Sequence, residues 1–281
     1  MSERSVLITG CSSGIGLTVA RGLAQRGWRV FATARREQDV ARLAEEGLES
    51  LPLDVTIPAT LGSALKTVLE RTGGTLDALF NNAGYGQPRA VEDLSREVLR
   101  AQFETNLFGA HELTCQVLPV MRRQGHGRIV QHSSILGFIA LPYRGAYIAS
   151  KFALEGLTDA LRQELDGTGI HVSLIETGPV RSRFRENSLL MYRRHIDAER
   201  SAHKSTYAAV EKRLTSSDEG GFLTLGPEAV LKKVVHALES PRPKPRYHVT
   251  LPTHLFKFVK RFLSTNAMDL LLLASTRSER R

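Results

Sequence analysis

The sequence has few cysteines and no long apolar run, and each absence argues against a class of protein. Cys11 and Cys115 are the only two cysteines, too few and too far apart for a disulfide framework or a metal site, so we expect no metal and a cytoplasmic, reducing compartment. No stretch approaches the roughly 20 apolar residues that cross a bilayer. The N-terminus lacks the charged and apolar regions of a signal peptide. Without an internal repeat or a Gly/Ser linker, residues 1–281 are expected to form a single domain.

The sequence does contain short β-branched runs that alternate with longer helical stretches, which is typical of βαβ units and a parallel sheet. Strands are expected at residues 5–9, 29–33, 48–53, 76–80, 127–133, 171–176 and 247–251. Helices are expected at residues 15–26, 37–46, 59–71, 100–123, 144–165 and 227–239. The pattern therefore predicts an α/β protein.

Glycines cluster between the first strand and the first helix, in the run TGCSSGIG at residues 9–16. Glycine lets the backbone approach a pyrophosphate, and a helix N-terminus offers free N–H groups and a favourable dipole. Such turns also occur wherever a chain reverses. It is the position between strand and helix that favours a dinucleotide site.

The end of the second strand favours NADP(H) over NAD. A site for NAD generally has Asp or Glu there, to bind the ribose 2′-hydroxyl. This strand ends in Ala34-Arg35-Arg36 without a carboxylate, and arginine suits a 2′-phosphate through charge-assisted hydrogen bonds. Ser12 and Ser13 could add neutral donors. The two arginines could equally be surface charges at the start of a helix, and only together with the missing acid do they favour NADP(H).

Tyr147 and Lys151 are spaced i and i+4, which places them on one face of a helix. A phenol has a pKa of about 10 in water and is a poor base near neutrality. An adjacent ammonium and a positively charged nicotinamide would lower that pKa. Ser134 precedes the tyrosine at the end of a predicted strand, where its hydroxyl could hold a carbonyl oxygen.

Together these motifs resemble the short-chain dehydrogenase/reductase family over nearly the whole chain. Residues 9–16 match the family's TGxxxGIG, and Asn81-Asn82-Ala83-Gly84 matches its NNAG. Asn106, Ser134, Tyr147 and Lys151 match its catalytic tetrad in order and at suitable distances. The resemblance implies a three-layer, doubly wound Rossmann fold with a mainly parallel seven-stranded sheet.

The resemblance also implies a role for each residue of the tetrad. Tyr147 would donate a proton to a carbonyl during reduction, or accept one during oxidation. Lys151 would lower the pKa of the tyrosine and hold the nicotinamide ribose. Ser134 would orient the substrate oxygen, and Asn106 would hold a water that links Lys151 to bulk solvent.

The cofactor contacts that the resemblance implies follow the ends of the strands. Asp54 would lie beside the adenine, Asn81 would line the ribose side, and Gly178-Pro179-Val180 would meet the nicotinamide carboxamide. The family commonly has Pro-Gly where this chain has Gly178-Pro179, which puts only the local turn in doubt. The full set is Gly10, Ser12, Ser13, Gly14, Ile15, Gly16, Arg35, Asp54, Val55, Asn81, Ala83, Gly84, Tyr147, Lys151, Gly178 and Val180.

Within the family the sequence is most similar to the 17β-hydroxysteroid and retinol dehydrogenase branch, and there to bacterial NADP-dependent aldehyde reductases. The residues that carry this similarity include the runs at 81–86, 109–114 and 225–230. The apolar residues at 136–143 would suit a hydrophobic aldehyde, ketone or alcohol, although several of them could simply pack under a lid. The long, polar and basic segment at about 181–222 is expected to be that substrate lid.

The C-terminal tail at about 252–281 is basic and amphipathic. Residues 242–281 contain nine Lys or Arg and two acids, and they carry most of the net charge of +9. We favour packing of its apolar face on the substrate entrance or a partner subunit, with weak peripheral contact with anionic lipid as the alternative. Nucleic acid is not expected, because the sequence has neither an aromatic-basic RNA motif nor a recognition helix.

Three functions stay open at this stage. The leading one is an NADP(H)-dependent oxidoreductase, and the second is a non-catalytic NADP-sensing or scaffolding protein on the same fold. The third, epimerisation or dehydration of a nucleotide sugar, usually requires a larger C-terminal substrate domain.

The helices expected near 106–123 and 147–165 resemble those that pair subunits in the family, which implies a homo-oligomer, a dimer or a tetramer.

Overall fold

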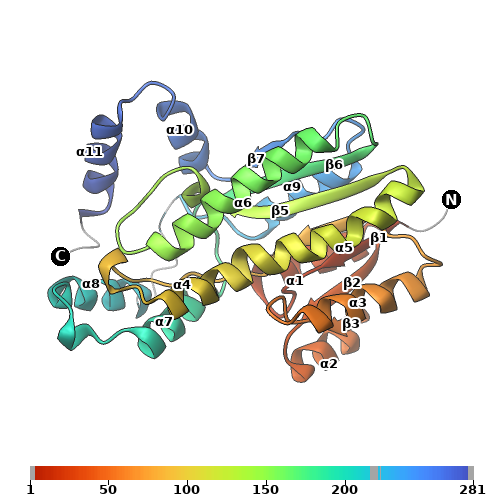
Figure 1. Ribbon diagram of the computed structural model, residues 1–281, viewed down its shortest axis with the longest axis horizontal. Coiled ribbons are helices and arrows are strands. Elements are labelled where there is room, and N and C mark those ends of the chain that lie inside the picture. The colour runs from red at the N-terminus through yellow and green to blue at the C-terminus, as the bar shows by residue number, and fades with distance from the viewer. Residues whose placement is uncertain (1–3, 216–220, 222, 278–281) are drawn as a thin grey trace.

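The computed structural model describes residues 4–215, 221 and 223–277, and its centre is a seven-stranded parallel sheet (Figure 1). The order across the sheet is β3-β2-β1-β4-β5-β6-β7. The strands are β1 (Ser5–Ile8), β2 (Arg29–Ala34), β3 (Glu49–Pro52), β4 (Ala78–Asn81), β5 (Gly127–Ser134), β6 (Ile170–Thr177) and β7 (Arg246–His248). Strand order reverses between β1 and β4, and ligands of such sheets bind beyond the carboxyl ends of the strands at this point. The predicted doubly wound Rossmann fold is confirmed.

Helices cover both faces of the sheet, which makes the three layers. On one face lie α1 (Gly14–Ala24), α2 (Glu37–Glu45) and α9 (Glu228–Glu239), and on the other α3 (Pro58–Arg71), α5 (Gly109–Gln124) and α6 (Gly145–Glu164). Every residue of β1 and β4 is buried, as expected for strands covered on both sides.

The helix expected at residues 100–123 is interrupted. It begins earlier, as α4 (Arg96–Phe103), then widens into a π-helical turn, η2 (Glu104–Phe108), before α5 continues. A π-helical turn re-aims side chains and is frequent at functional sites. The turn contains Asn106. Sequence periodicity could not reveal this interruption, because the apolar spacing hardly changes across it.

The segments outside the regular alternation are more helical than expected. Residues 181–222 contain α7 (Phe184–His195) and α8 (Lys204–Thr215), and residues 216–220 and 222 of the expected lid lie outside the described part of the chain. The last strand is shorter than expected, because α10 (Leu251–Val259) already begins at Leu251. A further helix, α11 (Thr265–Ser275), follows. Short 3-10 turns are η1 (Val91–Asp93), η3 (Ile135–Gly137) and η4 (Ala198–Arg200).

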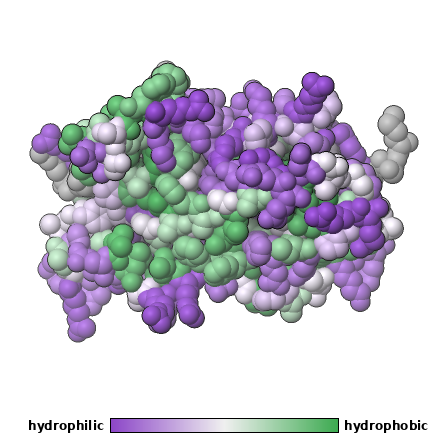
Figure 2. All heavy atoms as spheres, turned by 45° about the horizontal axis from the view of Figure 1, so that its top comes forward, coloured by the Kyte–Doolittle hydropathy of each residue, from purple (hydrophilic) through white to green (hydrophobic). Residues whose placement is uncertain are grey.

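The C-terminal helices pack on the segment that follows β5. Met268 and Leu272 of α11 are buried against Phe138 and Ile139, and Phe256 of α10 packs beside them. The outer surface of these helices is also apolar, as the green area at the upper left of Figure 2 shows. Among the described residues, no helix combines the length and the apolar character needed to cross a membrane.

Candidate active site

The four residues of the expected tetrad come from three elements that meet beyond the carboxyl end of the sheet. Ser134 is the last residue of β5, Tyr147 and Lys151 lie on α6, and Asn106 lies in the π-helical turn η2. The Asn106 side chain is buried, accepts a hydrogen bond from Tyr85 N at 3.1 Å and donates one to Tyr85 O at 2.9 Å. These two bonds attach η2 to the loop after β4.

The Tyr147 side chain is a neutral phenol with a raised pKa. Its ring packs edge-on against Phe184 of α7, with 5.3 Å between the ring centroids. Burial raises the pKa of Tyr147 to about 12, although a hydrogen bond with Ser134 opposes the increase. The phenol therefore keeps its proton at neutral pH, and losing that proton requires nearby positive charge.

Lys151 supplies positive charge beside this phenol. Its Nζ lies 5.7 Å from the centre of the Tyr147 ring and donates a hydrogen bond to His132 O at 2.6 Å. Burial lowers the pKa of Lys151 to about 8, and the charge of Glu155 opposes the decrease. A group with that pKa is mostly protonated at pH 7, so an ammonium faces the tyrosine.

His132 is a residue that the sequence analysis missed. Burial, reinforced by the charge of Lys151, lowers its pKa to about 3, so the ring is neutral. Its Nδ1 lies 3.0 Å from Asn82 Oδ1, while Asn82 Nδ2 donates to Thr9 O at 2.9 Å and to Gly10 O at 3.1 Å. Because Asn82 Oδ1 can only accept, Nδ1 of His132 carries the proton. This chain of hydrogen bonds connects β5, which contains His132, to the glycine-rich turn.

The glycine-rich turn is tightly packed, and two of its glycines have positive φ, +72° for Gly10 and +57° for Gly14. A Cβ atom on Gly16 would lie 2.3 Å from Gly10 O, so any larger residue would push the turn open. Ser13 makes no side-chain cap at the N-terminus of α1. The N–H groups at that end are thus available to a phosphate, which is the feature a bound dinucleotide requires. Ser12 precedes the cap, and Ile15 begins the buried face of α1.

The two arginines at the end of β2 have different surroundings. Arg36 donates to Asp39 Oδ2 at 2.8 Å, whereas Arg35 is exposed and makes no ion pair within the described part of the chain. Burial raises the pKa of Tyr85, and the positive charges of Arg35 and Arg194 oppose this, so Arg35 lies within electrostatic reach of the loop after β4. Arg42, another residue missed from the sequence, donates to Ser12 O at 2.6 Å and so fixes the turn from α2.

The remaining cofactor candidates flank this crevice. Ala83 N donates to Thr9 Oγ1 at 3.0 Å, and a Cβ on Gly84 would lie 3.2 Å from Asn106 Oδ1 and 3.8 Å from Lys151 Nζ. Asp54 accepts hydrogen bonds from Thr56, and Val55 beside it is buried against Gly109. At the other end, Gly178 contacts Thr250, and Val180 pairs with Leu225.

The amide of Asn81 bonds to residues of α5. Its Nδ2 donates to Ala110 O at 3.2 Å and to Thr114 Oγ1 at 3.0 Å, so the side chain points toward α5. The neighbouring Asn82, the first residue after β4, makes the contacts with the glycine-rich turn. Any contribution of Asn81 to a ribose site would come from its backbone.

A cavity of about 80 Å³ opens beside Tyr147. It lies between the end of β5, the loop after β4 and the helices α7 and α8. Its walls combine apolar and cationic side chains, from Gly86, Gln87, Pro88, Leu136, Arg144, Tyr147, Phe184, Arg185, Ser188, Arg213 and Leu214. No group of three or more His, Cys, Asp or Glu side chains suited to a metal ion occurs among the described residues.

Comparison with known proteins shows the family of this chain. The short chain dehydrogenase family matches residues 4–192. An uncharacterised oxidoreductase of Escherichia coli K12, YbbO, is 43% identical over 96% of this chain and 94% of its own length. Human 17-beta-hydroxysteroid dehydrogenase type 1 is 35% identical over 89% and 78%. A short chain dehydrogenase/reductase from Burkholderia phymatum in complex with NAD superposes with a TM-score of 0.77 at 25% identity, covering 96% of this chain and 95% of that chain.

This chain therefore belongs to the short-chain dehydrogenase/reductase family, an oxidoreductase family. The expected similarity to 17β-hydroxysteroid dehydrogenases is confirmed.

Proposed function

We propose that this chain is an NADP(H)-dependent oxidoreductase that interconverts a hydrophobic aldehyde or ketone and the corresponding alcohol. The observation that carries the proposal is the position of Tyr147 at the cavity, with Lys151 beside its ring and the Ser134 hydroxyl within hydrogen-bonding reach of its phenol. Bound NADPH would supply the hydride that adds to the carbonyl carbon. The chain itself has to position the carbonyl oxygen and deliver a proton to it.

In the direction of reduction, the carbonyl oxygen accepts hydrogen bonds from the hydroxyls of Ser134 and Tyr147. As the oxygen gains negative charge, the Tyr147 proton moves to it and leaves a phenolate. The Lys151 ammonium stabilises this phenolate, which lowers the barrier to proton transfer. Asn106, held by Tyr85 beside Gly84 and Lys151, is placed to hold a water through which the proton returns from solvent.

Residues 181–222 serve in this proposal as the substrate lid of a single domain formed by residues 1–281. Support comes from Phe184 of α7, whose ring packs on Tyr147 and would collide with a Cβ on Gly86, at 2.6 Å. The apolar side chains Leu136, Phe184 and Leu214 give the cavity its preference for a hydrophobic substrate. Aldehyde reduction is one activity within this class.

Arg35 is the residue that we expect to select NADP(H). Substitution Arg35→Asp removes a charge-assisted partner of a 2′-phosphate and adds the carboxylate that suits a 2′-hydroxyl. Because such bonds contribute about 1.5–3 kcal/mol, KM for NADPH should increase about 10- to 100-fold, while KM for NADH stays equal or falls.

Steady-state rates with both cofactors, for the wild type and for Arg35→Asp, measure this preference. Arg36→Ala is the matched control, since Arg36 is already held by Asp39. If the wild type binds NADPH but reduces no carbonyl compound, the NADP-sensing or scaffolding function replaces this one. Equal KM values for wild type and Arg35→Asp would reject only the choice of cofactor.

We also propose a homo-oligomer, a dimer or tetramer, formed through α5 and α6. Exposed apolar residues lie along this side, among them Phe108, Phe152 and Leu157, and a green band crosses the middle of Figure 2. Light scattering would contradict this proposal if it gave the mass of one chain at micromolar concentration.

The free cysteines Cys11 and Cys115 support the proposed cytoplasmic location.

For the tail we propose packing as its main role, supported by the buried contacts of α11 with Phe138 and Ile139. Weak peripheral contact with a membrane would use the outer stripe of α10, in which Leu251, Leu255 and Phe258 follow helical spacing and are exposed. Co-sedimentation with vesicles that contain phosphatidylserine tests this contact, and no binding would leave packing alone. Residues 278–281 lie outside the described part of the chain.

A further inference from the structure

A buried carboxylate lies one helical turn beyond Lys151 on the catalytic helix α6. Glu155 follows Lys151 at i+4, and its side chain is only 8% exposed. It does not belong to the tetrad, and it does not line the cavity beside Tyr147. Its negative charge raises the pKa of Lys151 and so opposes the effect of burial on that ammonium.

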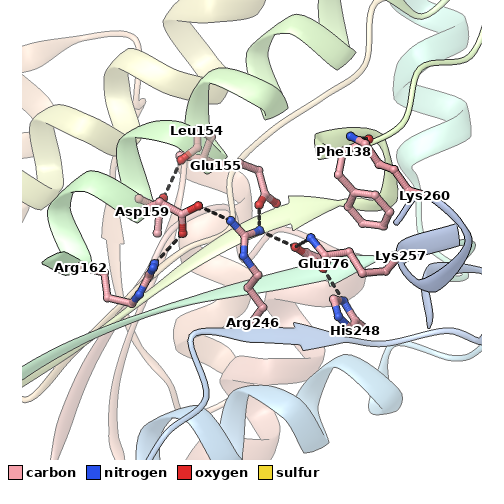
Figure 3. Close-up of polar contacts among 11 residues, drawn as sticks. Phe138, Leu154, Glu155, Asp159, Arg162, Glu176, Arg246, His248, Lys257 and Lys260 are labelled. Carbon is pink, nitrogen blue, oxygen red and sulfur yellow. Dashed lines mark hydrogen bonds and ion pairs between the residues drawn. The ribbon is translucent and has the colours of Figure 1, made fainter. Parts of the chain in front are cut away.

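The Glu155 carboxylate is held by Arg246 of β7 (Figure 3). Arg246 Nη1 donates to Glu155 Oε2 and to Glu176 Oε1, the latter at 2.6 Å, and Nη2 donates to Asp159 Oδ2 at 2.5 Å. One guanidinium thus joins α6, β6 and β7. Glu176 is fully buried and pairs with His248 as well, while Lys257 of α10 lies 3.8 Å from it.

Charged and titratable groups face these residues from each neighbouring element. Lys151 is faced by the neutral His132 of β5 and by Tyr147 and Glu155 of its own helix. Glu155 is faced by Glu176, Arg246 and Lys260, the residue that directly follows α10. Lys260 also donates a hydrogen bond to Phe138 O, which keeps α10 against this cluster.

Glu155 also has little room to move. A Cβ on Gly137 would lie 2.9 Å from Glu155 Oε1 and 2.6 Å from Ser133 Oγ. The turn after β5 therefore lies close to Oε1, whereas Arg246 bonds to Oε2. Burial, together with Glu176, raises the pKa of Glu155 to about 7, against the opposing effects of Ser133 and Arg246. Above neutrality the group is ionised.

We propose that Glu155 is a positioning residue of the active site: its carboxylate, fixed by Arg246, holds Lys151 as an ammonium beside Tyr147. The inference rests on the proposed function and goes beyond the tetrad. A negative charge at this place increases the proton affinity of the Tyr147–Lys151 pair, whichever of the two groups releases the proton. It also connects β7 and the C-terminal helices to catalysis, through Arg246, Lys257 and Lys260.

The pH profile of kcat for carbonyl reduction tests this role. Substitution Glu155→Gln removes the charge and leaves Arg246 with Glu176 and Asp159, so folding is expected to survive. The limb at which activity falls in base should move to lower pH by about one unit. Glu155→Met, a neutral residue of similar length, should show the same shift, and it decides the question if the glutamine variant does not fold. Glu155→Asp should restore the wild-type limb in part.

Glu164→Gln is the matched control, because Glu164 is an exposed carboxylate at the far end of the same helix. A basic limb that stays at the wild-type pH in Glu155→Gln or Glu155→Met overturns the proposal, even if their thermal stability falls. An equal shift in Glu164→Gln overturns it too, since any lost charge would then suffice. If Tyr147→Phe keeps full turnover, the proposed function fails. If Tyr147→Phe is inactive but the basic limb of the Glu155 variants stays at the wild-type pH, only the role of Glu155 fails.

Discussion

Substitution Tyr147→Phe is expected to lower kcat for carbonyl reduction by about 10²- to 10⁴-fold, the range that general acid catalysis contributes. The phenol is the protonated group next to the cavity, and burial keeps its pKa at about 12. Removing one oxygen leaves the ring contact with Phe184 in place. The defect should therefore be in the proton transfer and not in folding.

NADPH binding, followed by the fluorescence of the bound nicotinamide, should change by less than a few-fold in the same variant. Tyr247→Phe is the matched control, because it also removes the hydroxyl of a buried tyrosine. That hydroxyl accepts a hydrogen bond from Lys244 N at 2.8 Å, and Tyr247 is far along the sequence from the site. It should keep nearly full kcat. Full turnover by Tyr147→Phe would contradict the assignment of the acid.

Substitution Arg246→Ala is expected to lower the free energy of unfolding by about 3–5 kcal/mol, because it leaves buried carboxylates without their shared cation. Glu176 is fully buried and Glu155 nearly so, and both accept from the same Nη1 atom. Chemical denaturation measures the loss. Arg162→Ala is the control. Within the described residues, Arg162 bonds only to the partly exposed Asp159, at 2.5 Å, so its loss should cost less than about 1 kcal/mol.

The cost of Arg246→Ala should also depend on pH. In the wild type the pKa of Glu155 is already raised, to about 7, whereas that of Glu176 is lowered. Without the guanidinium both folded-state pKa values rise. A carboxyl with a raised folded-state pKa favours folding at low pH, and this contribution is lost as the pH rises through that value. The variant should therefore be least stable, relative to wild type, above about pH 7, where Glu155 would otherwise ionise. Equal losses of unfolding free energy in Arg246→Ala and Arg162→Ala would show that the contacts of Arg246 with the buried carboxylates contribute little to stability.

Much of the fold and the tetrad could be predicted from the sequence because their signals are local. Strand and helix alternation, the glycine-rich turn and the Tyr147–Lys151 spacing each lie within one or two adjacent elements. Parallel strands bring their carboxyl ends to the same edge, so motifs that follow β1, β4 and β5 necessarily meet there. The catalytic and cofactor roles themselves stay predictions, which the experiments above test.

The features that were missed depend on contacts between distant residues. Glu155 is visible in the sequence at i+4 from Lys151, but only the fold brings Arg246, some ninety residues later, onto it. The neutral state of His132 follows from burial that composition cannot reveal. The contacts of Asn81 and Asn82 depend on where β4 ends, because Asn81 is its last residue and bonds to α5, whereas Asn82 follows the strand and bonds to the glycine-rich turn. The π-helical turn at Asn106 leaves almost no trace in the apolar pattern.

The transfer of hydride from cofactor to substrate is the central claim, and it can be observed directly with NADPH carrying deuterium at both C4 positions. The wild-type protein is incubated with this cofactor and a panel of hydrophobic aldehydes, ketones and retinoids, and the products are analysed by mass spectrometry. The account predicts alcohols that carry one deuterium on the former carbonyl carbon, formed faster with NADPH than with NADH. NADPH binding without any deuterated alcohol would contradict it.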